Sequence, residues 1–122
     1  MANNKNSSFG PVPLTNAAAN YLNPATASGG VNAGSSAQYL LVKWIDFVNK
    51  TGSPHNFTAY LGLTGGSAAG TEVIGVAYVV AANTTYRWNG PLRIDSTQFL
   101  SMLADANTAI TISGEMEVGV SG

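Results

Sequence analysis

The sequence predicts an all-β protein: an antiparallel β-sandwich or jelly roll with an extended N-terminal arm and one short helix. After residue 38, runs rich in β-branched and aromatic residues recur at intervals of roughly 8–15 residues, as in such sheets. Gly, Asn and Pro residues separate these runs and supply the backbone conformations that turns require. No long helical segment lies between the runs, although a parallel sheet would need one for each crossover.

Residues 1–37 are predicted to form the arm, and residues 38–122 the sandwich domain. The first segment consists mainly of Ala, Asn, Ser and Gly, and Lys5 is its one charged residue. Such a segment has too few apolar side chains to offset its own ordering entropy, so in isolation it is a loosely held arm or a disordered tail. We expect it to dock on a partner through its large apolar residues, which are Phe9, Val12, Leu14, Tyr21 and Leu22.

Three strands are predicted in the first half of the sandwich domain. Tyr39–Val48 is rich in aromatic and β-branched residues, and the Asn, Gly and Pro of residues 49–54 then provide a turn. Phe57–Leu63 alternates between apolar and more polar residues, which predicts a half-buried strand. Val73–Val80 is almost continuously apolar, which predicts a strand that is covered on both faces or lies at an interface.

The next segment predicts two short strands and the helix. Residues 84–88 and 92–94 are the strands, and the Asn-Gly-Pro of residues 89–91 is expected to form a tight turn between them. Residues 96–103 are predicted to be helical because their apolar positions share one face at i, i+3 and i+4 spacing. These positions are Phe99, Met102 and Leu103.

The final predicted strand, Ile110–Val120, has the clearest alternation in the chain. One face is apolar and carries Ile110, Ile112, Met116, Val118 and Val120. The opposite face is polar and carries Thr111, Ser113, Glu115 and Glu117. The period of two predicts that the first set is buried and that the second is exposed or lies at a polar interface.

Composition excludes several kinds of chemistry. Only 9 % of residues are charged, against about 25 % in a typical domain, and the net charge is −1. The chain therefore lacks the basic field that nucleic acid binding requires. It has no cysteine, one histidine (His55) and no apolar run near the roughly 18 residues of a membrane span. We expect no cofactor, no metal site, no nucleic acid or membrane partner and no enzymatic activity.

Two motifs have features of ligand sites. Gly65–Thr71 has the glycine spacing of a phosphate loop, but it lacks the lysine before the threonine and a long helix after it. A flexible surface loop is the favoured interpretation. Glu115 and Glu117 face the same way on one strand, so they could divide acid and base roles or bind calcium. The favoured interpretation is that both glutamates simply lie on the solvent-facing side of a half-buried strand.

Two further groups of residues have features of a catalytic or a binding site. A catalytic triad could be written from Ser53 or Ser67 with His55 and Asp46, but no nucleophile-elbow pattern supports it. The aromatic residues could form a stacking platform for sugars, although core or intersubunit packing is favoured. These residues are Trp44, Tyr60, Tyr78, Tyr86 and Trp88, with Arg87 between the last two.

Four segments resemble small structural proteins of tailed bacteriophages. They read YLLVKWIDFVNKTG, AYLGLTGGSAAGTEVIGVA, YRWNGPLRIDSTQFL and ITISGEMEVGV, and they fall between Tyr39 and Val120. The resemblance implies a head decoration (cement) protein that sits on the major capsid shell, often as a jelly-roll dimer or trimer. It transfers no functional residue, because none of these segments is a catalytic or binding signature.

The resemblance and the composition together predict a non-enzymatic virion structural protein, assembled in the host cytoplasm. Its expected partners are the major capsid protein or another virion protein, and further copies of itself. A tail, neck or fibre component is the first alternative. A carbohydrate-binding β-sandwich module that uses Tyr86 and Trp88 is the second. A weakly charged chain with an apolar strand is prone to associate with other proteins. Such association suits a protein that bridges capsomers, because many weak repeated contacts then act together.

Overall fold

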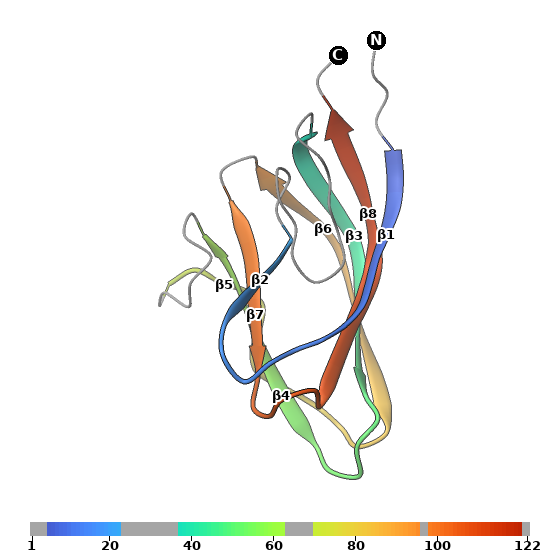
Figure 1. Cartoon of the computed structure of the whole chain (residues 1–122), viewed down its shortest axis with the longest axis vertical. Helices are drawn as coiled ribbons and strands as arrows, with labels where there is room; N and C mark the ends of the chain where they lie inside the picture. Colours follow the sequence, from blue (N-terminus) through green and yellow to red (C-terminus); the bar gives the residue numbers. More distant parts are fainter. Residues whose placement is uncertain (1–4, 23–36, 63–69, 96–97, 121–122) are drawn as a thin grey trace.

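Two four-stranded antiparallel sheets pack face to face in the computed structural model, which describes residues 5–22, 37–62, 70–95 and 98–120 (Figure 1). The first sheet has the strand order β1-β8-β3-β6, and the second has the order β2-β7-β4-β5. The strands are β1 (Lys5–Pro13), β2 (Ala19–Leu22), β3 (Ala37–Asn49), β4 (His55–Gly62), β5 (Glu72–Val80), β6 (Thr84–Asp95), β7 (Phe99–Ala104) and β8 (Ile110–Val120). This architecture confirms the predicted all-β antiparallel sandwich.

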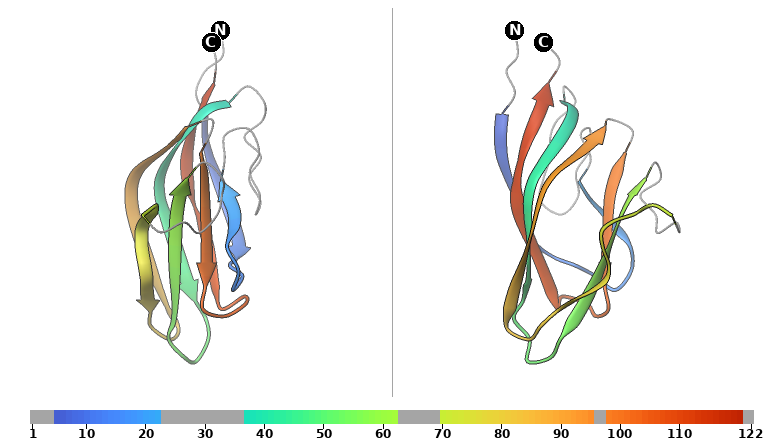
Figure 2. Two further views of the ribbon diagram at one scale, coloured as in Figure 1. Left: turned by 90° about the vertical axis from the view of Figure 1, so that its left-hand side faces the viewer. Right: turned by 180° about the vertical axis from the view of Figure 1, so that it is seen from behind.

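The chain crosses between the two sheets at almost every connection (Figure 2). Among the strands that the structure describes, β4 and β5 are the one consecutive pair that lies in the same sheet. Strands β3 and β8 lie in the centre of the first sheet, and β4 and β7 in the centre of the second. Pairing therefore joins segments far apart in the sequence, such as Lys5 with Val118.

The core lies between the sheets and follows the alternation of the strands. On β8, Ile110, Ile112, Met116 and Val118 are buried, whereas Glu115 and Glu117 are half-buried on the opposite face. The predicted orientation of this strand is confirmed for these residues. The best-buried side chains from the other strands include Leu40, Ile45, Phe47, Phe57, Ile94, Leu100 and Met102.

The first described segment, residues 5–22, is part of the sandwich, which corrects the expectation of an arm outside it. Strand β1 pairs with β8, and β2 pairs with β7. The connection between them is also fixed, because Leu14 donates its backbone N–H to the Ile110 carbonyl and accepts from the Thr108 N–H. Many residues of β1 and β2 are polar or small. They form strands because their backbone groups hydrogen-bond to β8 and β7, near the other end of the chain. The expected boundary after residue 37 thus separates strands that share the same two sheets.

The predicted helix over residues 96–103 is wrong for the part the structure describes, because Phe99–Ala104 forms strand β7. The segment also alternates with a period of two, and that alternation places Leu100, Met102 and Ala104 in the core. A run this short fits both periods, and pairing with β2 and β4 decides between them.

The predicted turn at residues 89–91 is also wrong, because β6 continues through it. A register shift between β3 and β6 accommodates Gly90 and Pro91 opposite Lys43. Such a bulge lets an extra residue leave the hydrogen-bonded ladder without ending the strand.

Candidate functional site

The two sheets differ sharply in charge. The strands of the second sheet contain one acidic residue, Glu72, and no lysine or arginine. Most charged residues of the chain belong to the strands of the first sheet, and they are Lys5, Lys43, Asp46, Arg87, Arg93, Asp95, Glu115 and Glu117. One outer face of the sandwich is therefore polar and charged, whereas the other is almost uncharged.

On the charged face, Trp44 of β3 joins residues from both neighbouring strands. Its indole N–H donates to Glu115 Oε1 at 3.2 Å. The guanidinium of Arg87 lies over the indole ring, with Cζ 4.1 Å from the ring centroid. Arg87 also donates two hydrogen bonds to the Asp46 carboxylate, at 2.7 and 2.9 Å. The paired guanidinium and carboxylate lower the pKa of Asp46 and raise that of Arg87, chiefly through these hydrogen bonds.

The same arrangement recurs farther along the strands around Tyr39. The Tyr39 hydroxyl donates to Glu117 Oε2 at 3.5 Å, and the guanidinium of Arg93 lies 4.3 Å from the ring centroid. Arg93 donates in turn to Asp95 at 2.7 Å. Each unit thus combines a glutamate from β8, an aromatic ring from β3 and an arginine–aspartate pair whose arginine comes from β6.

The two glutamates that the sequence singled out, Glu115 and Glu117, are hydrogen-bonded within these two units. Glu115 and Glu117 face the same way, as predicted, and each accepts a hydrogen bond from an aromatic side chain. Among the residues that the structure describes, no three His, Asp or Glu side chains group closely enough to hold a metal ion. The geometry therefore favours a structural role, in which the units tie β8, β3 and β6 together.

Strand β5, at the edge of the second sheet, carries exposed large hydrophobic side chains. Val76 is 64 % exposed, Val79 is 59 % and Tyr78 is 40 %. We call these three residues the β5 knob. They are the exposed large hydrophobic residues of the described part of the chain. The expectation that residues 73–80 are covered on both faces is thus wrong within this chain, and the alternative of an interface remains open.

Val76 lies in a bulge of β5, whereas Tyr78 and Val79 belong to the paired part of the strand that follows it. Phe57 pairs with Tyr78 and Ala59 pairs with Val73, so residues 74–77 lie opposite Thr58 alone. Ile74 and Ala77 adopt positive φ angles of 68° and 46°, which are unusual for residues with a side chain. The Ala77 N–H donates to the Thr58 hydroxyl at 2.8 Å, which fixes the bulge to β4.

Tyr78 connects the knob to the interior. Its ring stacks on that of Tyr86 from β6, with centroids 4.3 Å apart, and also lies 5.7 Å from the buried Phe57 ring. Burial, and then the neighbouring Tyr78, raise the pKa of the Tyr86 hydroxyl. The two tyrosines therefore bridge the sheets on the side where β5 and β6 are the edge strands.

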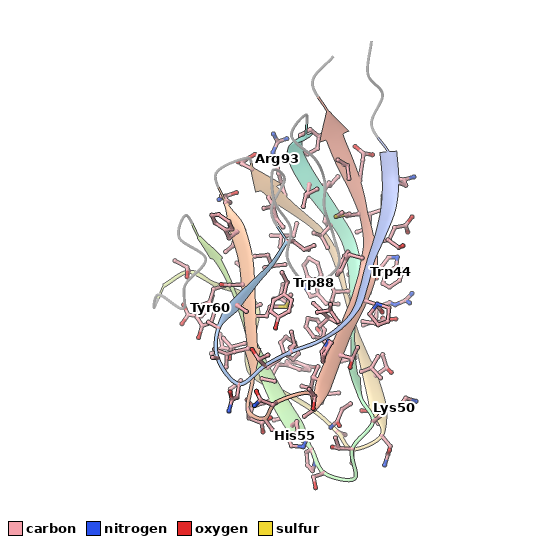
Figure 3. The ribbon with its side chains drawn as sticks, viewed as in Figure 1. Trp44, Lys50, His55, Tyr60, Trp88 and Arg93 are labelled. Carbon is pink, nitrogen blue, oxygen red and sulfur yellow. The ribbon has the colours of Figure 1, made fainter. Side chains whose placement is uncertain are left out.

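The structure separates the aromatic residues that the sequence grouped as a possible stacking platform. Trp44 and Tyr60 lie on opposite outer faces, and Trp88 lies between the sheets (Figure 3). Both Tyr86 and Trp88 pack against the buried core. Tyr78 and Tyr86 stack on each other, but the five rings do not together line one surface.

The possible triad is not assembled by the described residues. His55 Nδ1 lies 2.9 Å from Asp105 Oδ1, whereas Asp46 pairs with Arg87. Sequence spacing could not reveal the His55–Asp105 pair, because fifty residues separate its members. Ser67 and most of the Gly65–Thr71 loop lie outside the described residues.

The five residues expected to dock the arm on a partner lie in or against the sandwich core. Phe9, Leu14, Tyr21 and Leu22 are buried, and Val12 is half-buried against them. Their neighbours are the chain's own strands, so they stabilise this fold.

Comparisons with protein-family models, curated proteins and solved structures found no significant match to this chain. The described residues include no helix of the length and apolarity needed to cross a membrane.

Proposed function

We propose that the protein is a non-enzymatic structural component of a bacteriophage virion that decorates or cements the capsid through protein–protein contacts. The observation that carries this proposal is the uneven distribution of charge over the sandwich. Charged residues are depleted from the centres of protein interfaces, because burying an unpaired charge is costly. The second sheet, whose strands contain Glu72 as their one acidic residue and no lysine or arginine, matches that property.

The strand order supports a finer assignment of the fold. We propose that the sandwich is a jelly roll, in which eight strands form two four-stranded sheets and viral capsid domains are among the known members. The orders β1-β8-β3-β6 and β2-β7-β4-β5 agree with this topology. Since a fold alone does not specify a function, the proposal depends on the surface and on the resemblance of strands β3 to β8 to phage structural proteins.

The charged sheet fits the opposite role, a face that remains in solvent. Its arginine, aspartate and glutamate side chains are engaged with one another and with two aromatic rings. We therefore propose that the second sheet, with β5 at its edge, is turned toward protein partners and that the first sheet is turned outward.

Co-sedimentation with purified shells that lack the protein tests this function. We expect saturable binding at a fixed number of copies per shell. Tyr60 lies on the outer face of the second sheet, and Tyr60→Lys should weaken binding at least about tenfold, because it places an unpaired charge in the contact. The matched control is Thr111→Lys on the charged sheet, which should bind like the wild type. Absence of saturable binding by the wild type would contradict the proposal.

The alternatives predict different results. A tail, neck or fibre component would bind purified tails and not shells. A carbohydrate-binding module would retain glycans on an array, and Trp88→Ala would abolish that signal. The inward packing of Tyr86 and Trp88 disfavours this second alternative.

A further inference from the structure

We propose that the bulge of β5 closes this edge of the second sheet, so that no further strand can add to it. An edge strand presents unpaired backbone N–H and C=O groups, which can pair with an extended segment of another chain. Strand β5 is such an edge, because among the described strands it pairs with β4 alone. The inference goes beyond the proposed function and does not rest on it, since it concerns how the sheet ends and not what the protein binds.

Strand β5 has the most apolar sequence of the four edge strands that the structure describes. It reads EVIGVAYVV, with Glu72 as its one charged residue. The other edge strands read KNSSFGPVP (β1), ANYL (β2) and TTYRWNGPLRID (β6). Apolar segments of about six or seven residues, with strong strand preference and little charge, readily stack into sheets between chains when they are straight and exposed. A straight β5 would therefore be a site of unwanted strand pairing.

The bulge divides this apolar strand into two short pieces. Residues 72–73 and 78–80 pair with β4, whereas residues 74–77 between them lie opposite Thr58 alone. The longer piece has three residues, against about 5–6 in a typical strand. An incoming strand would therefore find no straight template of ordinary length along this edge.

Contacts within the chain hold the bulge in this shape. Ile74 and Ala77 have positive φ angles of 68° and 46°, which an extended strand does not contain. The Ala77 N–H donates to the Thr58 hydroxyl at 2.8 Å, so this donor is used within the chain. Gly75 packs so closely that a Cβ atom there would lie 2.9 Å from Tyr78 Cβ. Straightening the bulge would disturb these contacts, and the edge therefore stays closed.

The other three described edges are interrupted by different means. Strand β1 has a register shift after Phe9 and contains Pro11 and Pro13, and β6 has a register shift at the position of Pro91. Each proline removes a backbone donor, and a bulge bends the edge. Strand β2 is four residues long. The bulge of β5 thus protects the one edge strand that has neither proline nor a short length.

Deletion of residues 75–77 tests the proposal, because it removes the bulge and preserves the register. Ile74 alone then remains between Val73 and Tyr78, so the side chains still alternate and the pairs on either side keep their faces. We expect the full chain with this deletion to fold and to form larger oligomers than the wild type in sedimentation velocity, at concentrations from about 10 µM to about 1 mM. Val79→Lys in the deletion variant should reverse this change, because a lysine on an edge strand opposes strand addition.

Hydrogen exchange of the β5 amides distinguishes strand addition from association through other surfaces. In the wild type, exchange over residues 72–80 should be equal at both concentrations, because no further strand covers this edge. In the deletion variant, exchange should be at least about tenfold slower at the higher concentration, because carbonyls of the added strand accept from these amides. The proposal would be overturned by wild-type β5 amides that become protected as concentration rises. A folded deletion variant that gains no protection would overturn it equally.

A milder pair of variants keeps the test decisive if circular dichroism shows that the deletion variant does not fold. Thr58→Val removes the hydroxyl that accepts from the Ala77 N–H, which frees this donor and loosens the bulge. It should slow the exchange of β5 at the higher concentration. Thr58→Ser keeps the hydroxyl and is the matched control, which should behave like the wild type. Equal exchange in the valine and serine variants would overturn the proposal.

Discussion

Phe47 of β3 and Phe57 of β4 stack on each other between the sheets, with ring centroids 3.8 Å apart and ring planes 6° from parallel. They belong to consecutive strands that lie in different sheets, and both side chains are fully buried. Tyr86 extends the stack at 6.1 Å from Phe47, and Tyr78 lies beside it. The core is therefore continuous with the tyrosine pair that supports the β5 knob.

Removing one ring of this stack should strongly destabilise the fold. Phe57→Ala is expected to lower the free energy of unfolding by about 3–5 kcal/mol, because it leaves a cavity in a fully buried site. Urea denaturation measures the change. Tyr60→Ala on the outer face of the same strand is the control and should cost much less. Similar losses for the two variants would show that the assigned faces of β4 are wrong.

Gly114 should not tolerate a side chain. A Cβ atom there would collide with the Trp44 carbonyl oxygen and with the Phe9 ring. Both neighbours are held by strand pairing, so Gly114→Ala should destabilise by about 1–3 kcal/mol or more. Gly52→Ala is the control, because nothing lies within 4 Å of its Cβ position. Thermal melting compares them, and an unchanged midpoint for Gly114→Ala would contradict the packing of β1, β8 and β3.

Deletion of residues 1–22 should prevent folding. The deletion removes β1 and β2 and with them four buried side chains, Phe9, Leu14, Tyr21 and Leu22. Losing a large core side chain costs about 2–5 kcal/mol, so four losses exceed the stability of most domains. Circular dichroism and melting of the truncated chain provide the measurement. A cooperative transition near the wild-type midpoint would instead support an arm separate from the sandwich.

Acid should weaken the Asp46–Arg87 pair. The pKa of Asp46 is lowered in the folded protein, so the unfolded chain binds the proton first as pH falls. The pair contributes fully to folding stability above the pKa of the aspartate in the unfolded chain, about 3.9. This contribution is lost as pH falls through the lower pKa of Asp46 in the folded protein. Asp46→Asn should therefore reduce the loss of stability on acidification, measured by urea denaturation between about pH 6 and pH 2. Arg87→Gln should have the same effect, and an unchanged acid dependence in both would contradict the pairing.

Alkali should destabilise the fold through Tyr86. Its pKa is raised in the folded protein, chiefly by burial, so the folded state keeps the proton to higher pH than the unfolded chain. The protonated Tyr86 hydroxyl contributes fully to folding stability below the tyrosine pKa of the unfolded chain, about 10. This contribution is lost as pH rises through the higher pKa of the folded protein. Tyr86→Phe should flatten the fall in stability above about pH 9, as urea denaturation would measure. An alkaline dependence equal to that of the wild type would contradict the burial of this hydroxyl.

The sequence predicts elements well where the side chains alternate clearly. On β8, the period of two identified both the buried face and the glutamate face, because apolar and polar residues alternate along most of the strand. Strands β1 and β2 were missed because Asn, Ser, Gly and Pro carry little strand preference. Their structure comes from pairing with β8 and β7, which a local pattern does not reveal.

The surface was predictable only in part. The long apolar run of residues 73–80 indicated an interface or a covered strand, but not the bulge that exposes Val76. That bulge depends on the Thr58 hydroxyl and on two positive φ angles, which leave no mark in hydrophobic periodicity. The units around Trp44 and Tyr39 also depend on strand register, since each joins residues from β8, β3 and β6.

A density map of the phage particle, at a resolution that separates the two sheets of a small domain, tests the central proposal most directly. We predict copies of this sandwich at regular positions on the outside of the capsid shell, with the almost uncharged β2-β7-β4-β5 sheet toward neighbouring proteins and the charged sheet toward solvent. A particle whose shell carries no such density, in a preparation where the protein is found free of virions, would contradict the account.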